Sequence, residues 1–201
     1  ISDATGDFLA TYAGAHNGDL DILSASARID GGNLLIGSTQ NGAIGASAGS
    51  LFVWGVNRGS GTARLTLGSP SIGASILWDA VIVLFPDGNS RVVTFGPSGP
   101  PVITPLGGAV TINGDSISAV IPLALLGSTG YTPENYMFTL WSRLRVNPAA
   151  DGTNAEIADF APDFAGIRAS VPEPASWAMM IAGFAAIGGA LRRRRDGPVP
   201  A

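Results

Sequence analysis

The sequence has no cysteine, no lysine and a single histidine, His16. Because no disulfide can form, a domain of this composition must be stabilised by its hydrophobic core. A zinc site would need carboxylates for most of its ligands, which excludes the common cysteine and histidine sets. Nucleophilic catalysis needs a base beside the nucleophile, so a serine triad would depend on His16 alone. These absences favour a binding or structural role over an enzyme.

Charge is unevenly distributed along the chain. Up to residue 170 there are seven arginines and thirteen acidic residues, a net charge of −6, and four further arginines follow near the end. An acidic exterior disfavours nucleic acid and anionic lipid surfaces as partners. It is compatible with neutral sugars and with divalent cations. We therefore expect no nucleic-acid partner.

The most informative stretch lies near the end of the chain. It begins with Pro172, Glu173 and Pro174 and continues with residues 175–191, which carry no charge. Four consecutive arginines follow: Arg192, Arg193, Arg194 and Arg195. A helix over 175–191 would be roughly 25 Å long, and interfacial arginine side chains can make up the difference from a ~30 Å hydrocarbon core. We predict one transmembrane helix and an arginine stop-transfer signal that keeps the C-terminus in the cytoplasm.

Two further features favour a membrane segment here. Trp177 lies at the outer edge of the apolar run, where an amphipathic ring is favoured at the level of the lipid headgroups. The run has no polar face at helical spacing, which a surface helix of a soluble domain would need. The alternative is a buried helix followed by a basic end.

At these residues the chain resembles the PEP-CTERM sorting signal, in the variant with a Trp-Ala pair after the Pro-Glu-Pro motif. The resemblance implies an exported protein of a Gram-negative bacterium that makes exopolysaccharide. An exosortase-type membrane protease would recognise Pro172, Glu173 and Pro174 and remove the helix. The protein would pass through the inner membrane as a single-pass intermediate and end at the cell surface or outside the cell. Such signals occur on unrelated proteins, so nothing follows for residues 1–170.

Composition favours strands over helices in the rest of the chain. There are 28 glycines and 14 prolines, with many β-branched residues between them. Strands are expected at residues 19–29, 34–39, 51–57, 63–67, 76–85, 91–95, 109–112, 116–121, 135–146 and 156–160. Residues 76–85 are apolar on both faces, with Trp78 and Ala80 on one side, which predicts a central strand.

The spacing of strands and hairpins predicts an all-β fold, an antiparallel β-sandwich of the jelly-roll or Ig-like kind, followed by the single transmembrane helix. The expected divisions are residues 1–162 for the sandwich, 163–171 for a linker, 172–195 for the sorting signal and 196–201 for a disordered tail. No signal peptide is visible at Ile1, so we expect a leader to precede it.

Several aspartates could bind calcium, which prefers six to eight oxygen ligands. The candidates are Asp3 and Asp7 in the first turn, Asp19 and Asp21 on one face of the expected strand 19–29, and Asp159 near the last strand. A calcium ion there could join the two ends of the domain. The alternative is solvated turn aspartates, because no Asp-x-Asp-x-Asp-Gly loop is present.

Sugar binding would use an exposed aromatic ring, and Trp141 is the best candidate. It shares a face with Met137, Thr139 and Arg143, opposite the apolar side of its strand. Residues 3–29 and 117–126 are similar to DOMON and family 9 carbohydrate-binding sandwiches, which bind sugars, haem or calcium. We therefore expect a structural or carbohydrate-binding protein that contacts exopolysaccharide. The alternative is a glycoside hydrolase with a pair of carboxylates.

Overall fold

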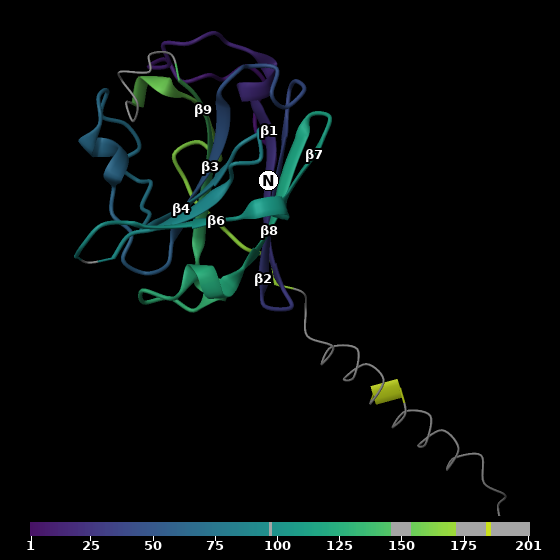
Figure 1. Cartoon of the computed structure of the whole chain (residues 1–201), viewed down its shortest axis with the longest axis vertical. Helices are drawn as coiled ribbons and strands as arrows, with labels where there is room; N and C mark the ends of the chain where they lie inside the picture. Colours follow the sequence, from purple (N-terminus) through teal and green to yellow (C-terminus); the bar gives the residue numbers. More distant parts are fainter. Residues whose placement is uncertain (97, 146–153, 172–183, 186–201) are drawn as a thin grey trace, which may run out of the picture. The chain divides into compact units, whose positions relative to one another are not determined.

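Short strands and glycine-rich turns build two antiparallel β-sheets before residue 171 (Figure 1). The computed structural model describes residues 1–96, 98–145, 154–171 and 184–185. The chain divides into two compact units, Ile1–Ser170 and Val171–Ala201.

The smaller sheet has the order β1 (Ile22–Asp30), β2 (Asn33–Gln40), β8 (Ser116–Pro122), β7 (Val110–Asn113). The larger sheet has the order β10 (Ile157–Ala161), β9 (Met137–Leu144), β3 (Ser50–Asn57), β4 (Ala80–Leu84), β5 (Arg91–Thr94), β6 (Val102–Pro105), and β11 (Ile167–Arg168) also pairs with β9. Gly31 and Gly32 both have positive φ in the β1–β2 turn, which suits a tight hairpin.

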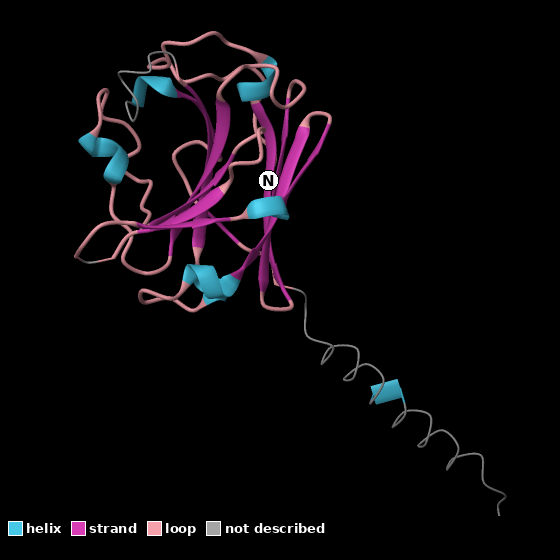
Figure 2. Cartoon of the chain, viewed as in Figure 1, coloured by secondary structure: helices cyan, strands magenta, loops and turns pink. Residues whose placement is uncertain are grey.

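Short helical turns lie between the strands (Figure 2). In the described part of residues 1–170 these turns are all 3₁₀: η1 (Gly18–Leu20), η2 (Arg64–Leu67), η3 (Gly107–Ala109), η4 (Leu123–Leu126), η5 (Pro133–Asn135) and η7 (Asn154–Glu156). Residues 63–67, predicted as a strand, therefore form η2. The proline-rich segment before β6 ends in an edge strand, as expected from the missing N–H donors of proline.

The two sheets pack face to face on a common core. In β3, Phe52, Trp54 and Val56 are fully buried against this core, whereas Leu51 and Val53 lie on the opposite face of the sheet. Burial on both faces is typical of a central strand, and β3 lies between β4 and β9. The predicted all-β fold of two antiparallel sheets is confirmed.

The predicted strand over residues 76–85 is too long. The ladder of β4 begins at Ala80, and Trp78 before it forms only an isolated bridge, with Thr62, which lies outside the named strands. Ile76 and Trp78 pack with Val81 on the outer face of the larger sheet, not with Ala80 in the core. The prediction that Trp78 shares the face of Ala80 was wrong, because side chains alternate between faces only within a continuous strand.

Residues 163–171, predicted as a linker, are mostly part of the domain. β11 pairs with Met137 and Phe138 of β9. The Ser170 N–H donates to the Ala27 carbonyl and the Ile29 N–H donates to the Ser170 carbonyl, each at 2.9 Å. The folded unit therefore extends to Ser170, where the prediction ended it at residue 162.

The predicted membrane helix lies almost entirely outside the described residues. Of residues 172–195, only Phe184 and Ala185 are described. Within the described parts of the chain, we find no helix with the length and apolar character that crossing a bilayer requires. The tail at residues 196–201 also lies outside the described part.

Candidate functional site

The outer face of the larger sheet holds the candidate site. Strand register places the side chains of Leu51, Val53, Val81 and Val83 side by side on this face of β3 and β4. They form the apolar floor of a solvent-open hollow of about 480 Å³. Its walls come from η2 and the segment that follows it, from β9 and from η7. We call this feature the outer hollow.

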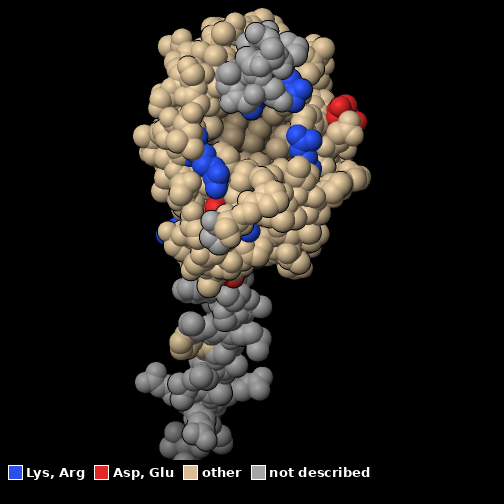
Figure 3. Space-filling view, turned by 60° about the vertical axis from the view of Figure 1, so that its left-hand side comes forward, with Lys and Arg blue, Asp and Glu red and all other residues tan. Residues whose placement is uncertain are grey.

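Arginines surround the outer hollow. Four of them line it: Arg64, Arg91, Arg143 and Arg145. Figure 3 looks onto this face and shows blue arginine side chains on opposite sides of the depression. Among the described residues that line it there is no aspartate or glutamate. A domain with net negative charge therefore presents a positive site here.

Aromatic rings hold two of these guanidinium groups. The Cζ atom of Arg64 lies 4.3 Å from the ring centroid of Phe95 and 5.3 Å from that of Trp78. The Cζ atom of Arg91 lies 5.0 Å from the ring centroid of Phe85. Stacking of this kind favours the cation without neutralising it. Neither Arg64 nor Arg91 forms an ion pair with a described residue.

Arg143 has a different environment. Its Nε and Nη2 atoms donate to Glu156 Oε2 at 3.0 and 2.5 Å, and Glu156 is fully buried. This pair fixes the side chain that projects from β9 toward the hollow.

A second open groove of about 1,080 Å³ continues from the outer hollow. The two share Leu51, Phe85, Arg91 and Arg145 in their lining. The groove continues past the β4–β5 turn to β6 and to Ile112 of β7. Together the two depressions form one continuous open surface that extends from η2 and β9 to β6 and β7.

Trp141 does not have the predicted exposure. Its side chain lies on the expected face of β9, but that face carries a second apolar layer, and Trp141 is only 3% exposed. Its ring packs near those of Trp78 and Phe160, with centroids 6.3 and 5.8 Å away. Trp141 therefore supports the base of the outer hollow, and the prediction of an exposed stacking platform was wrong.

Three of the predicted calcium ligands come together. One carboxylate oxygen each from Asp3, Asp7 and Asp159 lie within 4.8 Å of one another. Asp159 is 1% exposed, and its two oxygens accept hydrogen bonds from the N–H groups of Ile22 and Phe160, each at 2.7 Å. The cluster joins the start of the chain to β10, as predicted. Calcium binding there stays a prediction.

Asp19 and Asp21 do not join this cluster. Asp19 lies in η1 and accepts hydrogen bonds from the N–H and hydroxyl groups of Ser47, at 2.8 and 2.6 Å. Asp21 accepts from the Gly6 N–H and from Asn41 Nδ2, at 3.0 Å each. The prediction of a shared strand face was wrong because η1 turns the chain before β1 begins. Both carboxylates instead hold neighbouring loops.

The acidic cluster alters the acidity of its members. Burial raises the pKa of the Asp159 carboxyl to about 8, and the charges of Asp7 and Asp3 add to the increase against the N–H bonds from Ile22 and Phe160. Burial also raises the pKa of Asp3 to about 6, with further contributions from neighbouring carboxylates. At pH 7 the folded protein therefore keeps a proton on Asp159 that the unfolded chain has lost.

This proton should make the stability depend on pH. From about pH 4 to about pH 8 the folded state binds the Asp159 proton more tightly than the unfolded state does. The contribution of this group to the free energy of unfolding therefore falls as the pH rises. We expect the free energy of unfolding of the native chain, relative to Asp159→Asn, to decline over that range and then level off. Urea denaturation in the presence of a chelator measures it. A difference that stays constant with pH would mean that Asp159 is already ionised in the fold.

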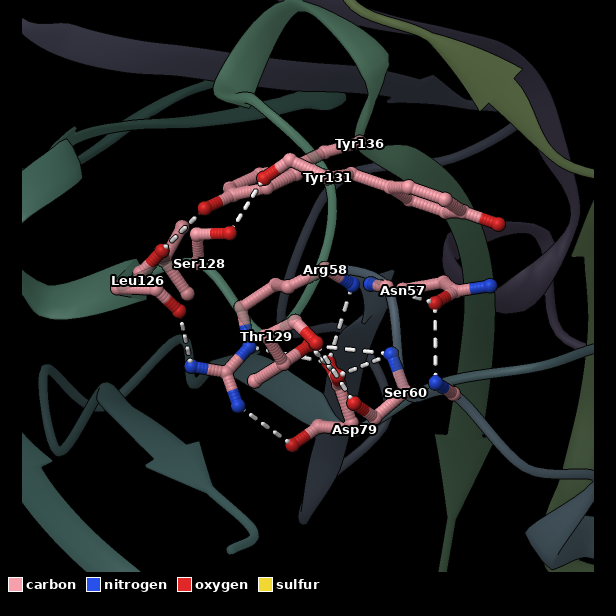
Figure 4. A network of polar contacts seen from close by, with 12 residues as sticks. Asn57, Arg58, Ser60, Asp79, Leu126, Ser128, Thr129, Tyr131 and Tyr136 are labelled. Carbon is pink, nitrogen blue, oxygen red and sulfur yellow. Dashed lines mark hydrogen bonds and ion pairs between the residues drawn. The ribbon is translucent and has the colours of Figure 1, made fainter.

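A buried ion pair lies at the ends of β3 and β4 (Figure 4). Arg58 Nε donates to Asp79 Oδ1 at 3.0 Å, and the two residues are 5% and 3% exposed. Asp79 Oδ2 accepts from the Thr129 hydroxyl and from the Ser60 N–H, and Arg58 Nη1 donates to the Gly127 carbonyl at 2.8 Å. The pair thereby connects the two strands to the loop after η4.

The same contacts determine the charge of Asp79. Burial acts to raise the pKa of its carboxyl, but hydrogen bonds from Thr129 and Arg58, together with the charge of Arg58, keep that pKa below its usual value. An ionised carboxylate with its oxygens bonded to donors holds structure in place and is a poor general base. We assign this network to stability.

Residues 45–49 read Gly-Ala-Ser-Ala-Gly and match the Gly-x-Ser-x-Gly pattern of serine hydrolases, a signal missed at the level of sequence. A nucleophile elbow exposes its serine between a strand and a helix. Here β3 follows, and Ser47 is buried with its hydroxyl bonded to Asp19. His16 is exposed and stacks on Phe8, with ring centroids 4.3 Å apart. These residues do not assemble a triad in the described structure.

Comparison with known proteins identifies the end of the chain. No curated protein matches the chain. The similarity of the sandwich to DOMON and family 9 domains therefore stays a prediction. Residues 170–195 match the PEP-CTERM protein-sorting motif, which confirms the predicted signal. The motif marks an exported protein that is sorted by an exosortase, is transiently anchored in a membrane and reaches the cell surface or the exterior.

Proposed function

We propose that the sandwich domain, once released from the inner membrane, binds carbohydrate of the extracellular matrix through the outer face of its larger sheet. The observation that supports this is the continuous groove formed by the outer hollow and its extension toward β6. Sites for small molecules are concave and bury most of their ligand. A long, open groove on a sheet suits an extended polymer instead, and matrix polysaccharides are extended polymers.

A glycoside hydrolase is the second candidate, because carboxylates do approach each other in this fold. Hydrolysis needs two acids on either side of the scissile bond, roughly 5 to 9.5 Å apart, with room for a sugar between them. Asp3, Asp7 and Asp159 are close enough, but they do not line the outer hollow or the groove that continues it. Asp159 is also buried. Binding without turnover is therefore the better-supported function.

Affinity electrophoresis tests the proposal. The full-length chain, purified in detergent, is run on native gels with and without embedded exopolysaccharide from the producing bacterium. We expect retarded migration in the polysaccharide gel, which the same polymer added in solution relieves. Equal mobility in both gels would refute carbohydrate binding. Release of new reducing ends during incubation would favour the hydrolase.

A further inference from the structure

We propose that the outer hollow selects acidic carbohydrate, and that Arg64 and Arg91 bind the carboxylate groups of uronate units. This inference rests on the proposed function and specifies its ligand. It differs from the expectation from total charge, which was compatible with neutral sugars.

Positive charge is concentrated at the outer hollow. Residues 1–170 have seven arginines, and four of them line the outer hollow; of these four, Arg143 is paired with Glu156. Asp87 is the one acidic residue among the described residues that line either the hollow or the adjoining groove. Like charges gathered in a concave site create a local field that the net charge of the domain does not cancel.

The side chains of Arg64 and Arg91 are oriented by aromatic rings but have no hydrogen-bond acceptor among the described residues. Neither Arg64 nor Arg91 donates a side-chain hydrogen bond to a described residue, and both are only partly exposed. Their guanidinium groups are held over aromatic rings, which reduces the freedom that they would lose on binding. A guanidinium donates two parallel hydrogen bonds to a carboxylate, so a carboxylated ligand would satisfy donors that the protein leaves unpaired.

The larger sheet provides an apolar surface between arginines on opposite sides of the outer hollow. Arg91 on β5 pairs with Val83, and Arg143 on β9 pairs with Leu51, so the two arginines lie on the same face with β3 and β4 between them. Three strand spacings separate β5 from β9, roughly 14 Å. The surface between them is aliphatic. A chain of sugar rings can place its apolar faces on this floor and its carboxylates against Arg91 at the β5 edge and Arg64 in the wall formed by η2, whereas Arg143 stays paired with Glu156.

Other anionic ligands fit less well. A fatty acid would leave its tail partly in water, because the hollow is open, and each exposed Å² of apolar surface costs about 25 cal/mol. Single-stranded nucleic acid is bound on exposed aromatic platforms, whereas Trp78 is covered by Arg64 and Trp141 is buried. A polymer with spaced carboxylates and apolar ring faces matches both the arginines and the aliphatic floor of the outer hollow.

Calorimetric titration of the full-length chain in detergent tests the inference with three probes: an oligogalacturonate, its fully methyl-esterified form and a DNA oligonucleotide of equal charge. We expect binding of the acidic sugar only, weakened by salt. Arg64→Gln and Arg91→Gln should each reduce its affinity about tenfold or more, since each loses a charge-assisted pair. Arg28→Gln, at an arginine of β1 in the smaller sheet whose side chain is about half exposed, is the matched control and should bind normally. Melting temperatures confirm that the variants are folded.

The outcomes separate the two proposals. Equal affinity for the esterified oligomer, or unchanged affinity in both hollow variants, overturns acidic selection and leaves carbohydrate binding standing. Absence of binding to the oligogalacturonate, with retardation still seen in exopolysaccharide gels, also overturns it. DNA binding as tight as that of the acidic sugar would show a general polyanion site. If the protein neither binds the oligogalacturonate nor is retarded in the exopolysaccharide gels, the proposed carbohydrate binding is itself refuted.

Discussion

Replacing either member of the Arg58–Asp79 pair by alanine should lower the free energy of unfolding by about 3–5 kcal/mol. Both side chains are almost completely buried, so each variant leaves an uncompensated charge in the interior. Asp79→Ala also removes the acceptor of the Thr129 hydroxyl and the Ser60 N–H, which frees the loop after η4 from β3. The measurement is urea denaturation followed by tryptophan fluorescence.

A double-mutant cycle distinguishes this pair from ordinary surface contacts. The double variant should lose less than the sum of the two single losses, by about 0.5–3 kcal/mol, because no lone charge remains. The matched control is the Arg28–Asp30 pair, which has a similar distance of 3.0 Å but side chains about half exposed. Removing it should cost less than about 1 kcal/mol. If Arg58→Ala were no more destabilising than Arg28→Ala, the pair would not hold the strands together.

The architecture of the sheets was largely predictable because two local signals agreed. In β3 the alternation of Phe52, Trp54 and Val56 with Leu51 and Val53 continues over the whole strand, so both faces could be read from the order of residues. Hairpins followed from glycines with positive φ. The pattern failed at Trp78, which lies before β4 begins at Ala80. An apolar run does not reveal at which residue the ladder hydrogen bonds begin.

The candidate site was much less predictable. Arg64, Arg91 and Arg143 are far apart in the sequence and share a site only because of strand register and the path of the segment after η2. The net charge of the domain hid this positive site, because it sums these arginines with acidic residues that lie elsewhere on the domain. The meeting of Asp3 and Asp7 with Asp159 was predicted, since the chain ends of a sandwich often lie close together. Residues 45–49 show the opposite case: they match the Gly-x-Ser-x-Gly pattern, but the fold does not place Ser47 in a nucleophile elbow.

The second large effect concerns release from the membrane. Glu173 is the one acidic residue between Asp163 and Asp196, and it lies inside the matched motif. A carboxylate recognised by a cationic group of a protease contributes a charge-assisted hydrogen bond, so its loss should reduce processing about tenfold or more. We expect Glu173→Ala to be exported but to accumulate as the full-length form in the inner membrane.

The structure makes this prediction separable from folding. In the part of the chain that the structure describes, the last strand ends at Arg168, and Ser170 is bonded to Ala27 and Ile29. A cut within residues 171–175 therefore leaves the sandwich complete, and Glu173→Ala leaves its stability unchanged. Glu134→Ala, at an exposed glutamate of η5, is the matched control and should be released normally.

Intact mass of the protein recovered from outside the cell decides whether the signal is removed. We expect the native protein and the Glu134→Ala control to end close to residues 171–175, without Trp177 and without Arg192–Arg195. The Glu173→Ala variant should be scarce outside the cell and full-length in the membrane fraction. A released native protein that still carries these residues would mean that the segment is not cleaved. Normal release of Glu173→Ala would mean that the protease reads the prolines or Trp177 and not the charge.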